Sequence, residues 1–265
     1  MNENSPLGIF DSGIGGLTVV REITELMPNE DIIYFGDTAR VPYGNKSKDT
    51  IIKYSFEIAD FLVARGAKML VVACNTASSL ALGELKEKFA VPVIGVIDSA
   101  AREAALLTRK KRIGVIGTEA TIESSAYTKV IKDYAPGLTV YSSACPLFVA
   151  LVEEGMLDGR ITELVCREYL GGMKKDDVDI LILGCTHYPL LKDSIGKIMG
   201  SGVSLLDSAY YTARSVKKTL LDLRLTSPED KKGSLSFYVS DSPARFIRIG
   251  EKFLGRKLDS VMRVE

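Results

Sequence analysis

The stretches MLVVACNTAS, residues 69–78, and DILILGCTHYP, residues 179–189, decide the fold class. In each, an unbroken aliphatic run leads directly into a cysteine and a polar segment. Runs that are apolar on both faces are typical of central strands in a parallel sheet covered by helices. Both stretches therefore predict a buried strand that ends beside a thiol, Cys74 in the first and Cys185 in the second.

Segments with helical periodicity separate such strands along the chain. Between residues 48 and 65, apolar side chains recur at intervals of three and four, which predicts an amphipathic helix. Strands that alternate with helices indicate an α/β architecture with parallel sheets. The predicted strands are Leu7–Phe10, Ile32–Phe35, Met69–Ala73, Pro92–Ile97, Arg112–Gly117, Leu138–Ser142, Asp179–Leu183, Val203–Leu206 and Ser236–Val239.

The two cysteine-bearing strands belong to a faint internal repeat. At similar distances after the two cysteines come Asp98-Ser99-Ala100 and Asp207-Ser208-Ala209, each at the end of a predicted apolar strand. Repeats of this kind indicate duplicated supersecondary units. We therefore expect two similar units, residues 1–98 and 99–208. The remaining helix, strand and helix, in 209–265, should pack onto one of them, with 226–233 as a surface loop.

Composition restricts the class of protein. Lys and Arg number 34, as do Asp and Glu, so nothing indicates a nucleic-acid partner. A signal peptide and a membrane-spanning apolar run are both missing from the sequence, which predicts a cytoplasmic protein.

The four cysteines form no C-x-x-C pair, and His187 is the single histidine, so the sequence argues against a zinc site. Taken alone, each cysteine is expected to be a small, buried hydrophobic side chain.

Polar clusters follow several strands at their carboxyl ends, where ligands bind in open α/β sheets. The first cluster, 11–16, combines Asp11 with glycines that allow a tight turn. Asp11 is also suited to capping the next helix, and the residues alone favour that interpretation. The second cluster, 36–44, fits a binding loop and a simple connector about equally well.

The two cysteines lie at matching positions in the repeat. A thiol that opens a helix experiences the positive end of the helix dipole, which can lower its pKa below about 8.5. Asn75, Thr76 and Thr186 would place further donors beside the sulfur atoms. For either cysteine alone, buried packing is the simpler explanation. Two thiols at matched strand ends of a duplicated unit favour a functional role for both.

Six segments stand out along nearly the whole chain: GIFDSGIGGLTV (8–19), YFGDTARVPYG (34–44), VVACNTAS (71–78), GVIGTEATIESSAY (114–127), CPLFVALVEEG (145–155) and GCTHYPLL (184–191). Together they resemble the successive signature segments of bacterial glutamate racemases, in the family's order. VVACNTAS together with GCTHYPLL is a specific pair, whereas the first segment alone would be weak support.

The resemblance implies two pseudo-symmetric α/β domains with the active site in the cleft between them. The first domain would be discontinuous and comprise 1–98 and 209–265, and the second would comprise 99–208. It further implies interconversion of L- and D-glutamate without a cofactor or metal, by proton transfer between two thiols. A homodimer and a role in supplying D-glutamate for peptidoglycan are also implied.

The family's functional residues map onto this sequence segment by segment. The catalytic thiols correspond to Cys74 and Cys185, and the supporting groups to Asp11, Glu153 and His187. The implied substrate-binding residues are Asp11, Ser12, Pro42, Tyr43, Gly44, Asn75, Thr76, Thr118, Thr121, Thr186 and His187.

Three alternatives remain at this stage. An aspartate racemase of the same superfamily would share the fold and thiols and differ in its pocket. A redox sensor would join Cys74 and Cys185 in a reversible disulfide and would not exchange α-protons. A non-catalytic amino-acid-binding protein would tolerate either cysteine becoming alanine.

Overall fold

The chain folds into two compact units, Met1–Val96 with Ala209–Glu265, and Ile97–Ser208. The computed structural model describes residues 2–230 and 232–264. Each unit contains one sheet, and every strand pairing recorded in the two sheets is parallel. The predicted α/β class with parallel sheets is confirmed.

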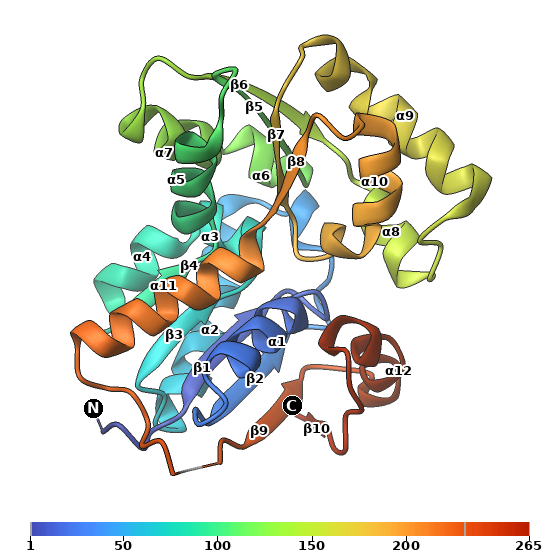
Figure 1. The fold of residues 1–265 in the computed structure, drawn as a ribbon. Helices are drawn as coiled ribbons and strands as arrows, with labels where there is room; N and C mark the ends of the chain where they lie inside the picture. The colour runs from blue at the N-terminus through green and yellow to red at the C-terminus, as the bar shows by residue number, and fades with distance from the viewer. Residues whose placement is uncertain (1, 231, 265) are drawn as a thin grey trace. The chain divides into compact units, whose positions relative to one another are not determined.

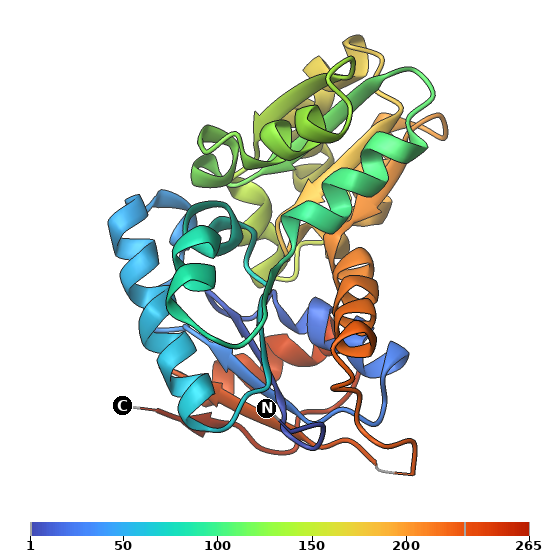
Figure 2. The same ribbon diagram turned by 90° about the vertical axis from the view of Figure 1, so that its left-hand side faces the viewer.

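The first unit is a six-stranded sheet in the order β10-β9-β2-β1-β3-β4, with helices on both faces. Figure 2 shows helix α2 and helix α1 on opposite sides of this sheet. The elements are β1 Leu7–Asp11, α1 Leu17–Leu26, β2 Ile32–Gly36, η1 Tyr43–Asn45, α2 Lys48–Ala64, β3 Met69–Val72, α3 Asn75–Leu80, α4 Leu82–Lys88, β4 Val93–Gly95, α11 Ser208–Asp222, β9 Leu235–Val239, α12 Pro243–Leu254 and β10 Met262–Arg263.

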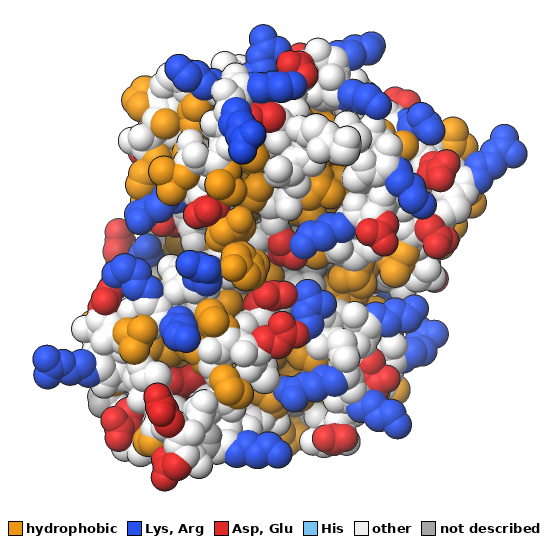
Figure 3. Space-filling model, in the orientation of Figure 1, with side chains coloured by type: hydrophobic (Ala, Val, Ile, Leu, Met, Phe, Trp, Pro, Cys, Tyr) orange, Lys and Arg blue, Asp and Glu red, His pale blue; other side chains and the backbone are white. Residues whose placement is uncertain are grey.

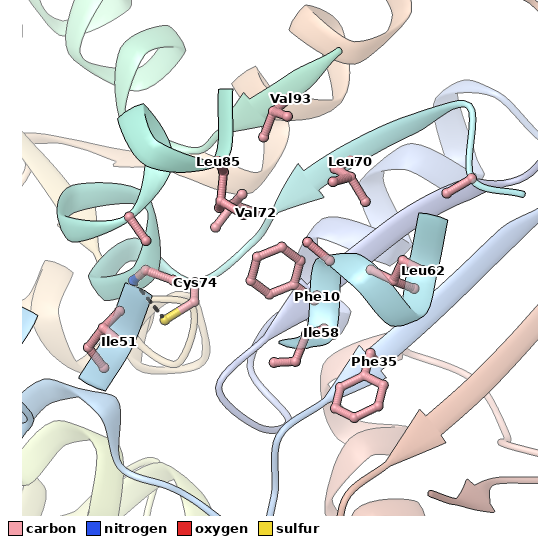
Figure 4. Packing of buried hydrophobic residues seen from close by; sticks show 14 of the residues in the cluster. Phe10, Phe35, Ile51, Ile58, Leu62, Leu70, Val72, Cys74, Leu85 and Val93 are labelled. Carbon is pink, nitrogen blue, oxygen red and sulfur yellow. Dashed lines mark hydrogen bonds between the residues drawn. The ribbon is translucent and has the colours of Figure 1, made fainter. Parts of the chain in front are cut away.

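Apolar side chains of β1, β3 and α2 form the core on one face of this sheet (Figure 4). Helix α2 begins after Ser47, whose side chain accepts a hydrogen bond from the amide of Thr50, and its buried stripe packs on the strands. A Cβ at Gly8 would lie 3.1 Å from the Cβ of Leu62, so glycine lets the helix approach β1 closely. Cys74 belongs to the same core, which fixes the backbone from which its thiol projects.

The C-terminal segment completes the first sheet, because β9 pairs with β2. The preceding loop was predicted to lie on the surface, and that prediction is wrong for Ser227, which is 4% exposed. The Ser227 amide and hydroxyl both donate to the carboxylate of buried Glu30. Lys231, in the same predicted loop, lies outside the described residues.

The second unit is a four-stranded sheet in the order β6-β5-β7-β8. In Figure 1, α5 and α7 lie on one side of this sheet and α9 and α10 on the other. The elements are α5 Ile97–Leu107, β5 Arg112–Gly117, α6 Glu119–Glu123, α7 Ala126–Tyr134, β6 Thr139–Ala144, α8 Leu147–Glu153, α9 Gly159–Lys175, β7 Ile180–Gly184, η2 Tyr188–Leu191, α10 Lys192–Met199 and β8 Ser204–Asp207.

The internal repeat is less regular than the sequence suggests. Strand β8 ends at Asp207, one residue beyond the predicted end, but β4 ends at Gly95 and Asp98 lies in the first turn of α5. The prediction of a strand through Ile97 was therefore wrong by two residues. Residues from Ile97 onward form helix α5 instead of extending the strand, because the alanines that follow Ser99 bury an apolar stripe against the second sheet.

Charged side chains of both signs are interspersed over the face shown in Figure 3, in keeping with the balanced composition. Across residues 2–230 and 232–264, no helix combines the length and apolar character needed to cross a membrane.

Candidate active site

Asp11 is the last residue of β1 and is fully buried at the carboxyl edge of the first sheet. Its carboxylate accepts a hydrogen bond from the amide of Gly13 at 3.0 Å, which shapes the turn that follows. Helix α1 begins only after Gly16, without a side-chain cap, so Asp11 does not cap the helix. A Cβ at Gly16 would come within 2.5 Å of the Asp11 Cβ, which explains why the turn needs a glycine there.

Cys74 lies beside this turn, at the end of β3. It is the N-cap of α3, and its sulfur accepts a hydrogen bond from the amide of Ala77 at 3.5 Å (Figure 4). Its thiol also lies 3.6 Å from the hydroxyl of Ser12. A backbone donor at a helix start stabilises negative charge, so the Ala77 amide is placed to stabilise negative charge on this sulfur. Asn75 and Thr76 form the first turn of α3 and are buried.

The loop after β2 brings Tyr43 to the same edge. Its hydroxyl donates to the carboxylate of Asp37 at 2.5 Å, and Asp37 in turn accepts from the hydroxyl of Ser240 at 2.8 Å. Burial, followed by the negative charge of Asp37, raises the pKa of Tyr43, so its phenol stays neutral. Asp37 was not among the predicted site residues, although its loop was. Its partner Ser240 is distant in sequence, and nothing in the loop alone indicates this contact.

In the second unit, Cys185 follows β7 and is 7% exposed. Its sulfur lies 3.8 Å from Nδ1 of His187, and Nε2 of His187 lies 3.2 Å from Oε1 of Glu153. The imidazole thus contacts the thiol through one ring nitrogen and a carboxylate from α8 through the other. Unlike Cys74, Cys185 does not cap the helix that follows, because η2 begins after His187.

His187 holds a proton in this arrangement. Burial alone lowers the pKa of an imidazole. Hydrogen bonds to Cys185 and Glu153, with the charges of both groups, outweigh the effect of burial and raise the pKa of His187 to about 10. The imidazolium can therefore donate toward the sulfur on one side and the carboxylate on the other.

Thr118 and Thr121 lie at the same edge of the second sheet, directly after β5. The Thr118 hydroxyl accepts from the amide of Thr121 and caps α6, and the two hydroxyls are 3.0 Å apart. Because Gly117 is in register with Gly184, these hydroxyls follow the strand beside the one that carries Cys185 and Thr186.

The other two cysteines are buried without such partners for negative charge. Burial raises the pKa of the Cys145 thiol to about 12 and that of Cys166 to about 11. Both behave as packed hydrophobic side chains. Within the described part of the chain, no cluster of three or more His, Cys, Asp or Glu side chains could hold a metal ion.

Each unit therefore places a thiol with polar partners, Cys74 in the first and Cys185 in the second, at the carboxyl edge of a parallel sheet. The sequence profile of the Asp/Glu/Hydantoin racemase family matches residues 13–216. The chain belongs to this family and is a racemase, an isomerase.

Within the family, the chain is similar over its full length to glutamate racemases. The enzyme from Geobacter metallireducens is 55% identical over 97% of this chain and 96% of its own length. The glutamate racemase of Francisella tularensis, solved in complex with D-glutamate, has 42% identity and a TM-score of 0.93 over 99% of this chain and 98% of that one. The glutamate racemase of Thermus thermophilus, solved with β-chloro-D-alanine, has 45% identity and a TM-score of 0.91. The match covers 100% of this chain and 98% of the Thermus chain.

Proposed function

We propose that the protein interconverts L- and D-glutamate. Support comes from full-length similarity to glutamate racemases, one of which was solved with D-glutamate. The observation that carries the proposal is the pair of thiols, each at a strand end with its own hydrogen-bonding companions. A redox sensor needs solvent-accessible thiols, whereas Cys74 and Cys185 are both buried. A binding protein would not need an imidazole and a carboxylate beside one of these thiols.

The proposed mechanism uses one thiol for each face of the substrate. Cys74, as thiolate, removes the α-proton from one enantiomer and becomes a thiol. Cys185, as thiol, donates its proton to the opposite face of the resulting carbanion and becomes a thiolate. The reverse reaction exchanges the two roles. Two bases avoid moving a single base around a planar intermediate.

The carbanion needs hydrogen-bond donors around the substrate carboxylate, where charge develops. We propose that the buried first turn of α3 and the two turns after β1 and β7 supply them. The residues assigned to this role are Ser12, Asn75, Thr76 and Thr186, with Pro42, Tyr43, Gly44, Thr118 and Thr121 also contacting the substrate.

Asp11 and His187 support the two thiols. The buried carboxylate of Asp11 lies at the turn that carries Ser12, close to Cys74. His187, held by Glu153, exchanges protons with Cys185. Positioned acids and bases of this kind contribute roughly 10²–10⁴-fold to proton-transfer reactions.

The mechanism predicts exchange at the α-carbon. In deuterium oxide, turnover of either enantiomer should replace the α-proton with deuterium, as followed by NMR. Cys74→Ala and Cys185→Ala should each abolish racemisation while the far-ultraviolet circular dichroism stays unchanged. Cys166→Ala removes a buried thiol of the same unit as Cys185 and should retain activity. Full activity in Cys185→Ala would exclude the two-thiol mechanism.

Substrate choice is tested separately, because the family description includes aspartate. A pocket discriminates against one missing methylene by roughly 10- to 200-fold. We expect kcat/KM for glutamate to exceed that for aspartate by at least this factor. The opposite order would identify an aspartate racemase with the same thiols.

We further propose that the enzyme needs no cofactor, works in the cytoplasm as a homodimer and supplies D-glutamate for peptidoglycan. Activity should survive dialysis against a chelator without added pyridoxal phosphate. Expression should restore growth and cell shape to a bacterial strain that requires D-glutamate. Light scattering on the purified enzyme tests the dimer.

A further inference from the structure

Two separate segments of the second unit must meet for His187 to contact Glu153. Glu153 is the last residue of α8, which follows β6, whereas His187 lies in the turn after β7. Strand β5 lies between β6 and β7 in the sheet, so direct strand pairing does not fix the distance between the two segments. Some other contact has to hold α8 against the turn.

The residue after His187 makes that contact. Tyr188 is fully buried, and its hydroxyl donates to the carbonyl of Cys145 at 2.9 Å. Cys145 is the residue that leads from β6 toward α8, and its own amide donates to the carbonyl of Gly117 at the end of β5. The Tyr188 hydroxyl thus ties the turn of Cys185 and His187 to the start of the segment that carries Glu153.

The ring of Tyr188 adds a second tie. Phe148, in the first turn of α8, packs edge-on against Tyr188 with ring centroids 5.2 Å apart and an interplanar angle of 88°. Phe148 packs equally against Tyr169 of α9, at 5.3 Å. The amide of Tyr188 also donates to the carbonyl of Cys185, which closes the turn. Helix α8 is therefore oriented by the side chain adjacent to His187.

From this geometry we infer that Tyr188 is a positioning residue, whose hydroxyl sets the contact between His187 and Glu153 and thereby the proton exchange at Cys185. Burial raises the pKa of Tyr188, so the hydroxyl remains a donor throughout the working pH range. Cys145 contributes its backbone amide and carbonyl and not its thiol, which is directed to the carbonyl of Ser143 at 3.7 Å. The inference rests on the proposed function of His187.

The test is Tyr188→Phe, which keeps the ring and removes the hydroxyl. Misplacing a catalytic group by a fraction of an ångström lowers rates substantially, so we expect kcat/KM to fall roughly tenfold. This decrease must be equal in both directions, because the equilibrium constant of a racemisation is one. The α-deuterium isotope effect should rise only for the enantiomer whose proton Cys185 removes.

Thr108→Val is the matched control. It also removes one hydroxyl hydrogen bond of the second unit, that from Thr108 to Asp179 at 2.6 Å. Asp179 precedes β7, so roughly 20 Å of strand, at about 3.3 Å per residue, separates it from Cys185. This variant should lose some thermal stability and keep both isotope effects.

A double-variant cycle distinguishes positioning from general destabilisation. In a His187→Asn background, Tyr188→Phe should have no further effect on kcat, because the group that it places is gone. Additive effects, or unchanged kinetics in Tyr188→Phe, would overturn the inference. If His187→Asn itself leaves the rate unchanged, the proposed role of His187 fails instead. Should Tyr188→Phe not accumulate as folded protein, Phe148→Leu disturbs the packing of the same ring and should shift the same isotope effect.

Discussion

The charge on His187 is decided by a competition between burial and two neighbours. Burial favours the neutral ring, yet hydrogen bonds from the imidazolium to Cys185 and Glu153 bring the pKa to about 10. An unperturbed histidine titrates near 6.5, so the proton is retained at neutral pH. The stability that this proton contributes is complete below the unfolded-state pKa and is lost as pH rises through the folded-state value.

Replacing Glu153 by Gln removes one of the two charges that hold this proton. We expect the pKa of His187 to fall by roughly one unit or more, each unit corresponding to about 1.4 kcal/mol. His187 is the only histidine in the sequence, so its ring resonances can be followed by NMR without ambiguity. Glu154→Gln, an exposed neighbour with the same charge, should leave the titration unchanged. A wild-type midpoint near 6.5 would contradict this description.

At the residue scale, contacts between residues close in sequence could be predicted, whereas contacts between residues distant in sequence could not. His187 stands two residues from Cys185, so their contact was visible from spacing. Glu153 entered only through the resemblance to a family, because its contact with His187 depends on α8 folding back across the sheet. Asp37 was overlooked as a site residue because its contact with Ser240 joins segments from opposite ends of the chain.

Helix α3 illustrates how an element and a reactive group share one position. Cys74 is both the N-cap of this short helix and the proposed base. Serine is among the best N-cap residues, but its hydroxyl is far less acidic than a thiol. The two roles of this position can therefore be separated by one substitution.

We predict that Cys74→Ser abolishes racemisation and changes the free energy of unfolding by less than about 1 kcal/mol, since the cap is kept. Cys74→Ala should lose the cap, at a cost near 1 kcal/mol, together with activity. Urea denaturation and polarimetry measure the two properties. Substantial activity in Cys74→Ser would show that this position acts only as a cap.

Element positions were predictable because buried strands leave a strong apolar signal. Strand β5 was predicted with its observed bounds, and β1, β2, β3 and β9 to within one residue at either end. The predicted end of β4 was wrong because an apolar residue such as Ile97 fits a strand end and a helix start equally well. The two-residue strand β10 was missed, since its exposed residues carry no apolar pattern.

At the scale of the whole molecule, the first unit is built from two separate parts of the chain. Strand β9 pairs with β2, so residues after 209 complete a sheet begun by residues 7–11. The length of 209–265 indicated that this segment packs onto another unit, but sequence alone gave no contact. Ser227 supplies one, because its amide and hydroxyl bind Glu30, nearly two hundred residues earlier.

Lys68 completes this attachment. Its ammonium lies 2.6 Å from the Glu30 carboxylate, with both side chains almost fully buried, and it also donates to the carbonyl of Glu3. Removing one member of a buried ion pair leaves an uncompensated charge, which lowers the free energy of unfolding by about 3–5 kcal/mol. A typical domain has a free energy of unfolding of only about 5–15 kcal/mol, so this loss is a large part of it.

Lys68→Met should therefore destabilise the protein by about 3–5 kcal/mol in urea denaturation, and Lys68→Met with Glu30→Gln should recover most of the loss by removing the second charge. Lys218→Met breaks an exposed pair with Asp222 in α11 and should cost less than about 1 kcal/mol. Equal losses in Lys68→Met and Lys218→Met would mean that the buried pair does not hold the C-terminal segment to the first unit. A larger loss that the second substitution reverses would show that the uncompensated Glu30 charge causes it, and that this buried pair supports the attachment of 209–265 alongside the pairing of β9 with β2.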